Sequence, residues 1–194
     1  MTFSELKEPI CLYVGEIPTW RTGDKIVGIS PEHGGSRYVR HDIRDKFPLP
    51  DSCVDRVESE SVFEYIEEDS LITILNEIYR ILKRGCLLRL SVPDYRGPII
   101  FERCRKRNGV IFMDPVGGSG VRWFPVIETV MDICEASMFE KINYLHYYSI
   151  SGVPVVKKID HSMGMVRRTP DFDERVIKDR LPLSIVVDLI KQGN

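Results

Sequence analysis

The chain has 194 residues, of which 43% are hydrophobic and 29% charged, and its formal net charge is −2. This length and composition are typical of one globular domain, so we expect residues 1–194 to form a single domain. The near-neutral charge gives no general attraction to nucleic acid or to an anionic membrane, and we expect neither partner. No apolar run reaches the roughly 18 residues that a membrane span needs. The polar residues 1–9 do not resemble a signal peptide.

The number and spacing of the cysteines indicate that the protein is in a reducing environment. They are five in number and form no C-x-x-C pair, which argues against a disulfide framework or a zinc site. We therefore expect no bound metal and a cytoplasmic location. Cys11, Cys86 and Cys134 lie in apolar runs and are predicted to be small buried residues. The basic cluster at residues 103–107 is predicted to be a solvated helix face.

Short apolar runs in the first half of the chain predict strands buried on both faces. The first two are residues 10–14 and 25–29, and the stretch between them has room for at most a helical turn. Further strands are predicted at residues 37–43, 54–59 and 86–92. Strands that alternate with helical patterns favour a parallel sheet.

Two amphipathic helices are predicted, at residues 67–83 and 126–138. In the first, Leu71, Leu75 and Ile78 belong to one apolar stripe, and Gly85 is expected to end the helix. Two β-like runs at residues 141–150 and 183–190 have no long helix between them. We therefore predict an α/β fold with a single Rossmann-like, doubly wound sheet, mostly parallel with an antiparallel edge strand.

A family resemblance rests on the order and spacing of several segments. In chain order they read HDIR (41–44), FPLPDSCVD (47–55), VFEYI (62–66), ILNEIYRILKRG (74–85) and LRLSVPD (88–94). This succession resembles the middle of the class I S-adenosylmethionine (SAM)-dependent methyltransferases. The tail segments 171–175 and 184–191 resemble a small bacterial subgroup often associated with modifying surface saccharides. The resemblance covers most of the chain and is strongest over residues 38–94.

The resemblance implies that SAM is the cofactor and lies across the C-terminal ends of the parallel strands. Asp42 would accept a hydrogen bond from the adenine amine, and Ile43 would pack on the ring. The residues alone also allow Asp42 to cap a turn, and allow Glu60 and Ser61 to belong to a solvated loop. The cofactor contacts that the resemblance implies are Val14, Gly15, Glu16, Ser30, Asp42, Ile43, Glu60 and Ser61.

Two positions depart from the family pattern. Ile17 stands where a second glycine would allow close backbone approach, and Pro18 beside it lacks an N–H donor. Ser30 replaces the acid that would bind the ribose hydroxyls, with Glu32 as a nearby substitute. Losing a hydrogen bond that involves a charged group lowers the affinity by about tenfold or more.

Few residues mark the acceptor chemistry. The candidates for a catalytic group are His41, Tyr65 and Asp94, and Tyr65 occupies a position where many relatives carry His. We expect residues 95–125 and 150–180 to be variable insertions on the substrate side. Residues 117–124 are either a mobile loop that grips the substrate or a packed connector.

The resemblance implies methyl transfer from SAM to a small-molecule or saccharide-like oxygen or nitrogen acceptor, and it leaves a homodimer open. The alternative is a degenerate family member that has lost catalysis and acts as a binding or partner module. The altered loop at residues 15–19, together with Ser30 and Tyr65, favours that alternative. A nucleic-acid methyltransferase ranks below both, because the sequence shows no general basic character.

Overall fold

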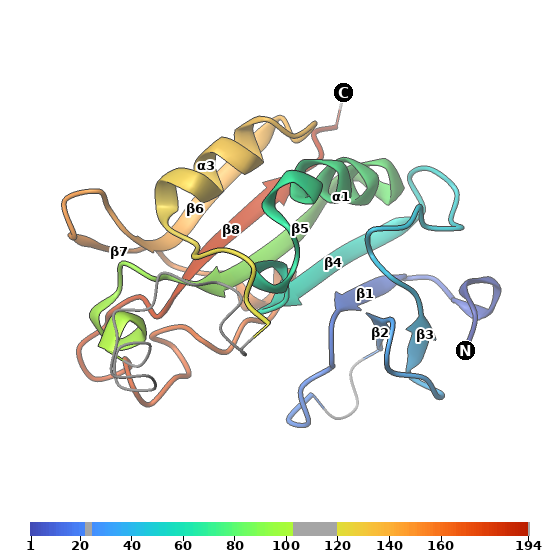
Figure 1. Ribbon diagram of the computed structural model, residues 1–194. Helices are drawn as coiled ribbons and strands as arrows, with labels where there is room; N and C mark the ends of the chain where they lie inside the picture. Colours follow the sequence, from blue (N-terminus) through green and yellow to red (C-terminus); the bar gives the residue numbers. More distant parts are fainter. Residues whose placement is uncertain (22–24, 103–119, 194) are drawn as a thin grey trace.

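The computed structural model describes residues 1–21, 25–102 and 120–193. It contains a sheet of eight strands in the order β3-β2-β1-β4-β5-β8-β6-β7 (Figure 1). The first five strands in the chain pair in parallel. They are β1 (Cys11–Val14), β2 (Ile26–Ser30), β3 (Tyr38–Arg40), β4 (Val54–Glu60) and β5 (Leu82–Pro93). The predicted parallel sheet is therefore confirmed.

The antiparallel edge is also confirmed, and it is three strands wide. It consists of β8 (Ser184–Ile190), β6 (Lys141–Tyr148) and β7 (Pro154–Val156), and β8 pairs with β5. The short hairpin partner β7 was not predicted. Its three residues are too few to show an alternating pattern.

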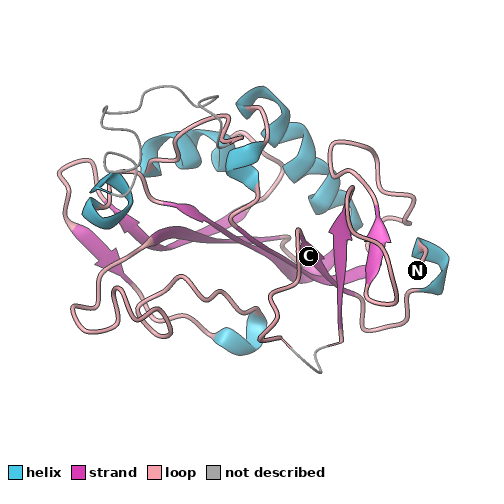
Figure 2. Ribbon diagram, turned by 60° about the horizontal axis from the view of Figure 1, so that its bottom comes forward, coloured by secondary structure: helices cyan, strands magenta, loops and turns pink. Residues whose placement is uncertain are grey.

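The helices α1 (Glu68–Ile81) and α3 (Ile127–Glu135) pack on the same face of the sheet (Figure 2), and residues 98–102 are also helical. The predicted apolar stripe of α1 is confirmed, because Leu71, Leu75 and Ile78 are fully buried. Single 3-10 turns form η1 (Phe3–Glu5), η2 (Phe63–Tyr65) and η3 (His161–Met163). In the described ranges, no helix is long and apolar enough to cross a membrane.

The predicted end of the first helix at Gly85 is wrong. The helix stops at Ile81, and Leu82 already pairs with Val54 in the sheet. Gly85 lies inside β5 with φ 78°, where the register between β4 and β5 shifts. Strand pairing therefore ends the helix, and the glycine allows the irregularity that follows.

The sheet face opposite α1 and α3 carries a buried row of charged residues and is partly covered by residues 157–183, a long segment with little regular secondary structure (Figure 2). Glu58, Arg89 and Asp188 are register neighbours on β4, β5 and β8. Arg89 donates to both carboxylate oxygens of Asp188, each at 2.7 Å. Arg89 also donates to the carbonyl of Gly164, and the N–H of Met165 donates to Glu58 at 3.0 Å. Buried charges therefore fix the covering segment to this face.

The described cysteines are free thiols. Cys134 is fully buried, as predicted, whereas Cys11 and Cys86 are only partly buried. Cys53 is also free and partly buried. Cys104 and the basic cluster at residues 103–107 lie outside the described residues.

Candidate functional site

The carboxyl ends of β1, β2 and β4 meet at one edge of the sheet. β1 lies between β2 and β4, and their last residues are Val14, Ser30 and Glu60. From β1 the chain moves to β2 and β3 on one side and returns to β4 on the other. Such a switch in strand order is where open α/β sheets bind ligands. Most of the predicted cofactor residues lie at or directly after these three strand ends.

The loop after β1 is shaped by close packing. Gly15 has φ 111°, and an added Cβ would lie 2.6 Å from Cγ2 of Val62. A glycine is therefore required where this loop approaches the segment after β4. Ile17 is buried, and its N–H donates to Oη of Tyr38 at 2.9 Å. The branched residue thus anchors the loop to β3, and its backbone donor is already used.

Ser30 is committed to a local turn. Its Oγ accepts from the N–H groups of Glu32 and His33 at 3.2 and 3.3 Å. The Glu16 side chain is 70% exposed, and its Oε1 lies 3.9 Å from Nε2 of His33. The structure therefore places no carboxylate directly at the end of β2, although Glu16 and Glu32 lie nearby.

Asp42 caps a turn after β3. Its Oδ1 accepts from the N–H of Arg44 at 3.0 Å, and its Oδ2 pairs with Nη2 of Arg44 at 2.5 Å. Hydrogen bonding to Arg44 lowers the pKa of Asp42, so the carboxylate stays ionised at neutral pH. Its side chain remains 27% exposed, and Ile43 beside it is buried. The turn and a contact with a ligand amine are compatible.

The three catalytic candidates have different surroundings. His41 packs between Phe3 and Phe47, with ring centroids 5.2 and 4.7 Å away. Asp94 is fully buried and accepts from the N–H groups of Arg96 and Tyr148, so it joins the ends of β5 and β6.

Tyr65 is the candidate that is open to solvent. It is 48% exposed in η2, directly after the β4 end. Of the three candidates, Tyr65 is therefore the most accessible to a bound molecule.

Two carboxyls at and after the end of β4 lie in unusual environments. Burial raises the pKa of Glu60, although its Oε1 accepts from the N–H groups of Arg167 and Arg168 at 3.0 and 2.7 Å. Glu64 is 1% exposed, burial raises its pKa to about 7, and its Oε2 has no partner among the described residues. Perturbed carboxyls of this kind gather at functional sites. The sequence analysis missed Glu64, and the available signal was a lone acid inside an apolar run.

A second unsatisfied polar atom lies at the same edge. Ser61 has φ 56°, and its Oγ is buried with no hydrogen-bond partner in the part of the chain that the structure describes. Buried polar atoms are normally paired, so an orphaned hydroxyl here fits a site that is completed by a ligand.

A cavity of about 460 Å³ opens beside Glu60. Its lining combines two aromatic rings with charges of both signs: Trp20, Glu60, Arg167, Arg168, Phe172, Asp173, Glu174 and Arg175. Asp173 and Arg175 form an ion pair at 2.6 Å. A wall of rings and hydrogen-bonding groups suits a polar molecule with an apolar face.

Residues 120–124, the described part of the segment 117–124, form a packed connector, which is one of the two alternatives that the sequence allows. Trp123 is buried and donates from Nε1 to the carbonyl of Phe63 at 3.0 Å. Phe124 packs edge-on against Tyr95, with ring centroids 4.8 Å apart. Residues 117–119 lie outside the described residues.

Comparison with known proteins finds similarity to methyltransferases. Residues 23–90 match the family described as "Methyltransferase domain". No curated protein matches the chain. A SAM-dependent methyltransferase of Thermotoga maritima, titled a possible histamine N-methyltransferase, superposes with a TM-score of 0.60 at 19% identity, covering 97% of this chain and 84% of its own.

Two archaeal structures share the same fold. A SAM-dependent methyltransferase of Archaeoglobus fulgidus has a TM-score of 0.55 at 16% identity, covering 92% of this chain and 84% of its own. One of Methanosarcina mazei has a TM-score of 0.52 at 13% identity, covering 98% of this chain and 96% of its own. At such identities the likeness shows the fold alone.

Proposed function

We propose that this chain is a class I SAM-dependent methyltransferase and that it transfers a methyl group to an oxygen or nitrogen atom of a small, polar or saccharide-like acceptor. The observation that carries the proposal is the junction of the β1, β2 and β4 ends with a mixed cavity beside Glu60. One strand edge can then hold the cofactor and the acceptor next to each other, which is most of what methyl transfer requires of a protein.

The residues at this edge fit SAM in most respects. Gly15 allows the backbone to approach closely, Asp42 is ionised, and Ser61 offers an unpaired hydroxyl. When bound, SAM supplies a methyl group that its sulfonium already activates. Ser30 provides no charge for the ribose, so we expect weaker binding than an acid at this position would give.

Glu60 is the residue that we propose as the general base, which takes the proton of the acceptor. Its Oε1 is held by two backbone N–H groups, and Oε2 has no partner among the described residues. Oε2 would accept the proton as the acceptor's oxygen or nitrogen forms its new bond to carbon. The raised pKa makes this carboxylate a better base than an exposed one. Trp20 and Phe172 would hold the acceptor's apolar face.

Calorimetric titration with SAM and with its demethylated product tests the cofactor site. Asp42→Ala removes a hydrogen bond to a charged group and should weaken binding by about tenfold to a hundredfold. Asp45→Ala, an exposed acid in the same turn, is the matched control and should bind like the wild type. Equal binding by Asp42→Ala would refute the adenine placement, and no binding by the wild type up to millimolar ligand would overturn the function.

Replacing Glu60 tests the acceptor side. Glu60→Gln keeps an oxygen for the two backbone donors but cannot take a proton, so turnover should fall by about 10²–10⁴ while SAM affinity is unchanged. The readout is formation of the demethylated cofactor across a panel of hydroxyl and amine acceptors. Glu174→Gln, in the same cavity, is the control. Unchanged turnover in Glu60→Gln would remove Glu60 from the mechanism.

A non-catalytic binding module is the second candidate. The turn at Ser30 and the engaged N–H of Ile17 favour it, because both use groups that a cofactor would otherwise meet. Cofactor binding without turnover on any acceptor would support this reading.

We also propose a cytoplasmic location, with the acceptor as the main partner and with neither nucleic acid nor membrane bound. The four free cysteines in the described residues are consistent with a reducing compartment. A homodimer is also proposed as possible in solution, and light scattering would measure the oligomeric state.

A further inference from the structure

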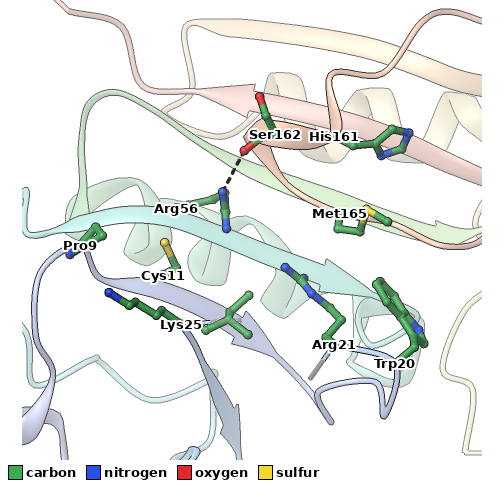
Figure 3. Close-up of a pocket in the computed structure, with 10 residues that line it drawn as sticks. Pro9, Cys11, Trp20, Arg21, Lys25, Arg56, His161, Ser162 and Met165 are labelled. Atoms are coloured by element: carbon green, nitrogen blue, oxygen red, sulfur yellow. Dashed lines mark hydrogen bonds between the residues drawn. The ribbon is translucent and has the colours of Figure 1, made fainter. Parts of the chain in front are cut away.

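A second cavity, of about 520 Å³, lies on the sheet face opposite α1 and α3 (Figure 3). Cys11 and Ile26, the first residues of β1 and β2, line it. Leu12 points into the core beside α1, so its neighbour Cys11 faces the other side of the sheet. The cavity therefore begins at the opposite ends of these strands from the candidate SAM site, and it extends along the face to Trp20. Its size is typical of a small-molecule site.

Positive charge dominates this cavity. Arg21, Lys25 and Arg56 line it, and no carboxylate is among its described lining residues (Figure 3). Behind them lies Glu58, which is fully buried. Its carboxylate accepts hydrogen bonds from both terminal nitrogens of Arg21 and pairs with Nε of Arg56 at 2.8 Å. Glu58 thus pairs with both arginines of the cavity.

Arg56 and Lys25 are positioned to meet a ligand. Arg56 donates from Nη1 to the carbonyl of Ser162 at 3.1 Å, and its Nη2 has no partner among the described residues. Lys25 is exposed and forms no ion pair within the described ranges. The nearby carboxylate of Asp55 is already paired with Lys83 at 2.9 Å. Lys25 and the outer nitrogen of Arg56 are therefore available to an anion.

An aromatic and apolar wall completes the cavity. Trp20 is partly buried, and the guanidinium carbon of Arg21 lies 5.7 Å from its ring centroid. Met165 lines the same cavity from the covering segment (Figure 3). An indole ring and a thioether both favour contact with a planar, polarizable group. One part of the cavity thus suits an anion and another suits a ring.

We propose that this cavity binds a small organic phosphate, with its phosphate between Lys25 and Arg56 and its planar part against Trp20. A phosphate monoester carries about −1.5 to −2 charges at neutral pH, opposite in sign to the charges of Lys25 and Arg56. Arg and Lys are the side chains that proteins use to bind phosphate. Trp20 also lines the cavity beside Glu60, but Cys11, Lys25 and Arg56 do not, so binding of the phosphate does not depend on methyl transfer.

Alkylation of the cysteines by N-ethylmaleimide, read by mass spectrometry, can locate the ligand. Cys11 lines the cavity, whereas Cys53 and Cys86 are equally free and partly buried but lie outside it. Phenyl phosphate is the probe, because it joins a ring to a phosphate without resembling SAM. It should slow the alkylation of Cys11 alone. Phenol and inorganic phosphate, which each lack one half of the probe, should protect less at the same concentration.

Lys25→Gln should weaken this protection by about fivefold, because it removes one charged contact. Lys178→Gln, an exposed lysine elsewhere, should not change it. SAM affinity should be the same in both variants, so failure here is separable from failure of the proposed function. If about 10 mM phenyl phosphate does not protect Cys11 from alkylation, the proposal is overturned. Equal protection of all three cysteines, or full protection in Lys25→Gln, would also overturn it.

Discussion

The buried carboxyl of Glu64 opposes folding at neutral pH. Burial raises its pKa from 4.5 to about 7 in the folded protein. Below pH 4.5 both the folded and the unfolded chain keep the proton, so this group has no effect. Above that value the unfolded chain ionises while the folded chain does not, and stability falls until the pH passes about 7. The loss can reach roughly 3 kcal/mol, at about 1.4 kcal/mol per pH unit.

Glu64→Gln should remove this penalty. The variant should match the wild type near pH 4.5 and exceed its stability at pH 8, by up to roughly 3 kcal/mol. Urea unfolding at several pH values measures the difference, with the exposed Glu32→Gln as the control. Parallel pH profiles for Glu64→Gln and the wild type would show that Glu64 is not protonated in the folded protein. A stabilised variant with lower turnover would indicate that the acid is retained for function.

At the scale of secondary-structure elements, β4, β5 and β8 are joined by buried charge. Arg89 is 1% exposed and bridges Asp188 to the carbonyl of Gly164 in the covering segment. Arg89→Met leaves the Asp188 carboxylate unpaired and should cost about 3–5 kcal/mol of unfolding free energy. Arg89→Met with Asp188→Leu removes both charges, so the double variant should be more stable than Arg89→Met alone. A double variant no more stable than the single one, measured by urea unfolding, would contradict a paired buried charge.

This charge row also shows what the sequence could and could not predict. Local patterns located β1, β2, β4, β5, α1 and α3, because burial periodicity is a local property. Arg89 and Asp188 are 99 residues apart, and no local pattern shows that they are neighbours. The prediction that Gly85 ends the helix was wrong for the same reason, because the helix already ends where Leu82 pairs with the distant Val54.

The candidate site followed a similar division. Strand order and the family resemblance placed Gly15, Asp42 and Glu60 at or next to the strand ends. The cavity beside Glu60 could not be predicted, because Arg167 and Arg168 reach it from more than 100 residues away. Which polar groups are already satisfied, as Ser30 is and Ser61 is not, depends on three-dimensional contacts that one sequence does not show.

For the whole molecule, the sheet separates two differently built layers. Helices α1 and α3 pack on one face with an apolar core, and the segment 157–183 covers part of the other through buried polar contacts and a small apolar cluster (Figure 2). Both layers share the same strands, and Glu58 and Arg89 alternate along β4 and β5 with core residues such as Val57 and Leu88. We therefore expect residues 1–194 to unfold as one cooperative domain.

The chain's two tryptophans report on the two layers separately. Trp123 lies in the core beside α3, and Trp20 lines the cavities on the opposite side. Trp123→Phe leaves only Trp20, and Trp20→Phe leaves only Trp123. In each variant the fluorescence and far-ultraviolet circular dichroism transitions in urea should coincide, because a shared sheet couples the layers. Loss of Trp20 fluorescence at lower urea than the circular dichroism change would instead show that the layer around Trp20 opens before the sheet, and a single cooperative domain would be refuted.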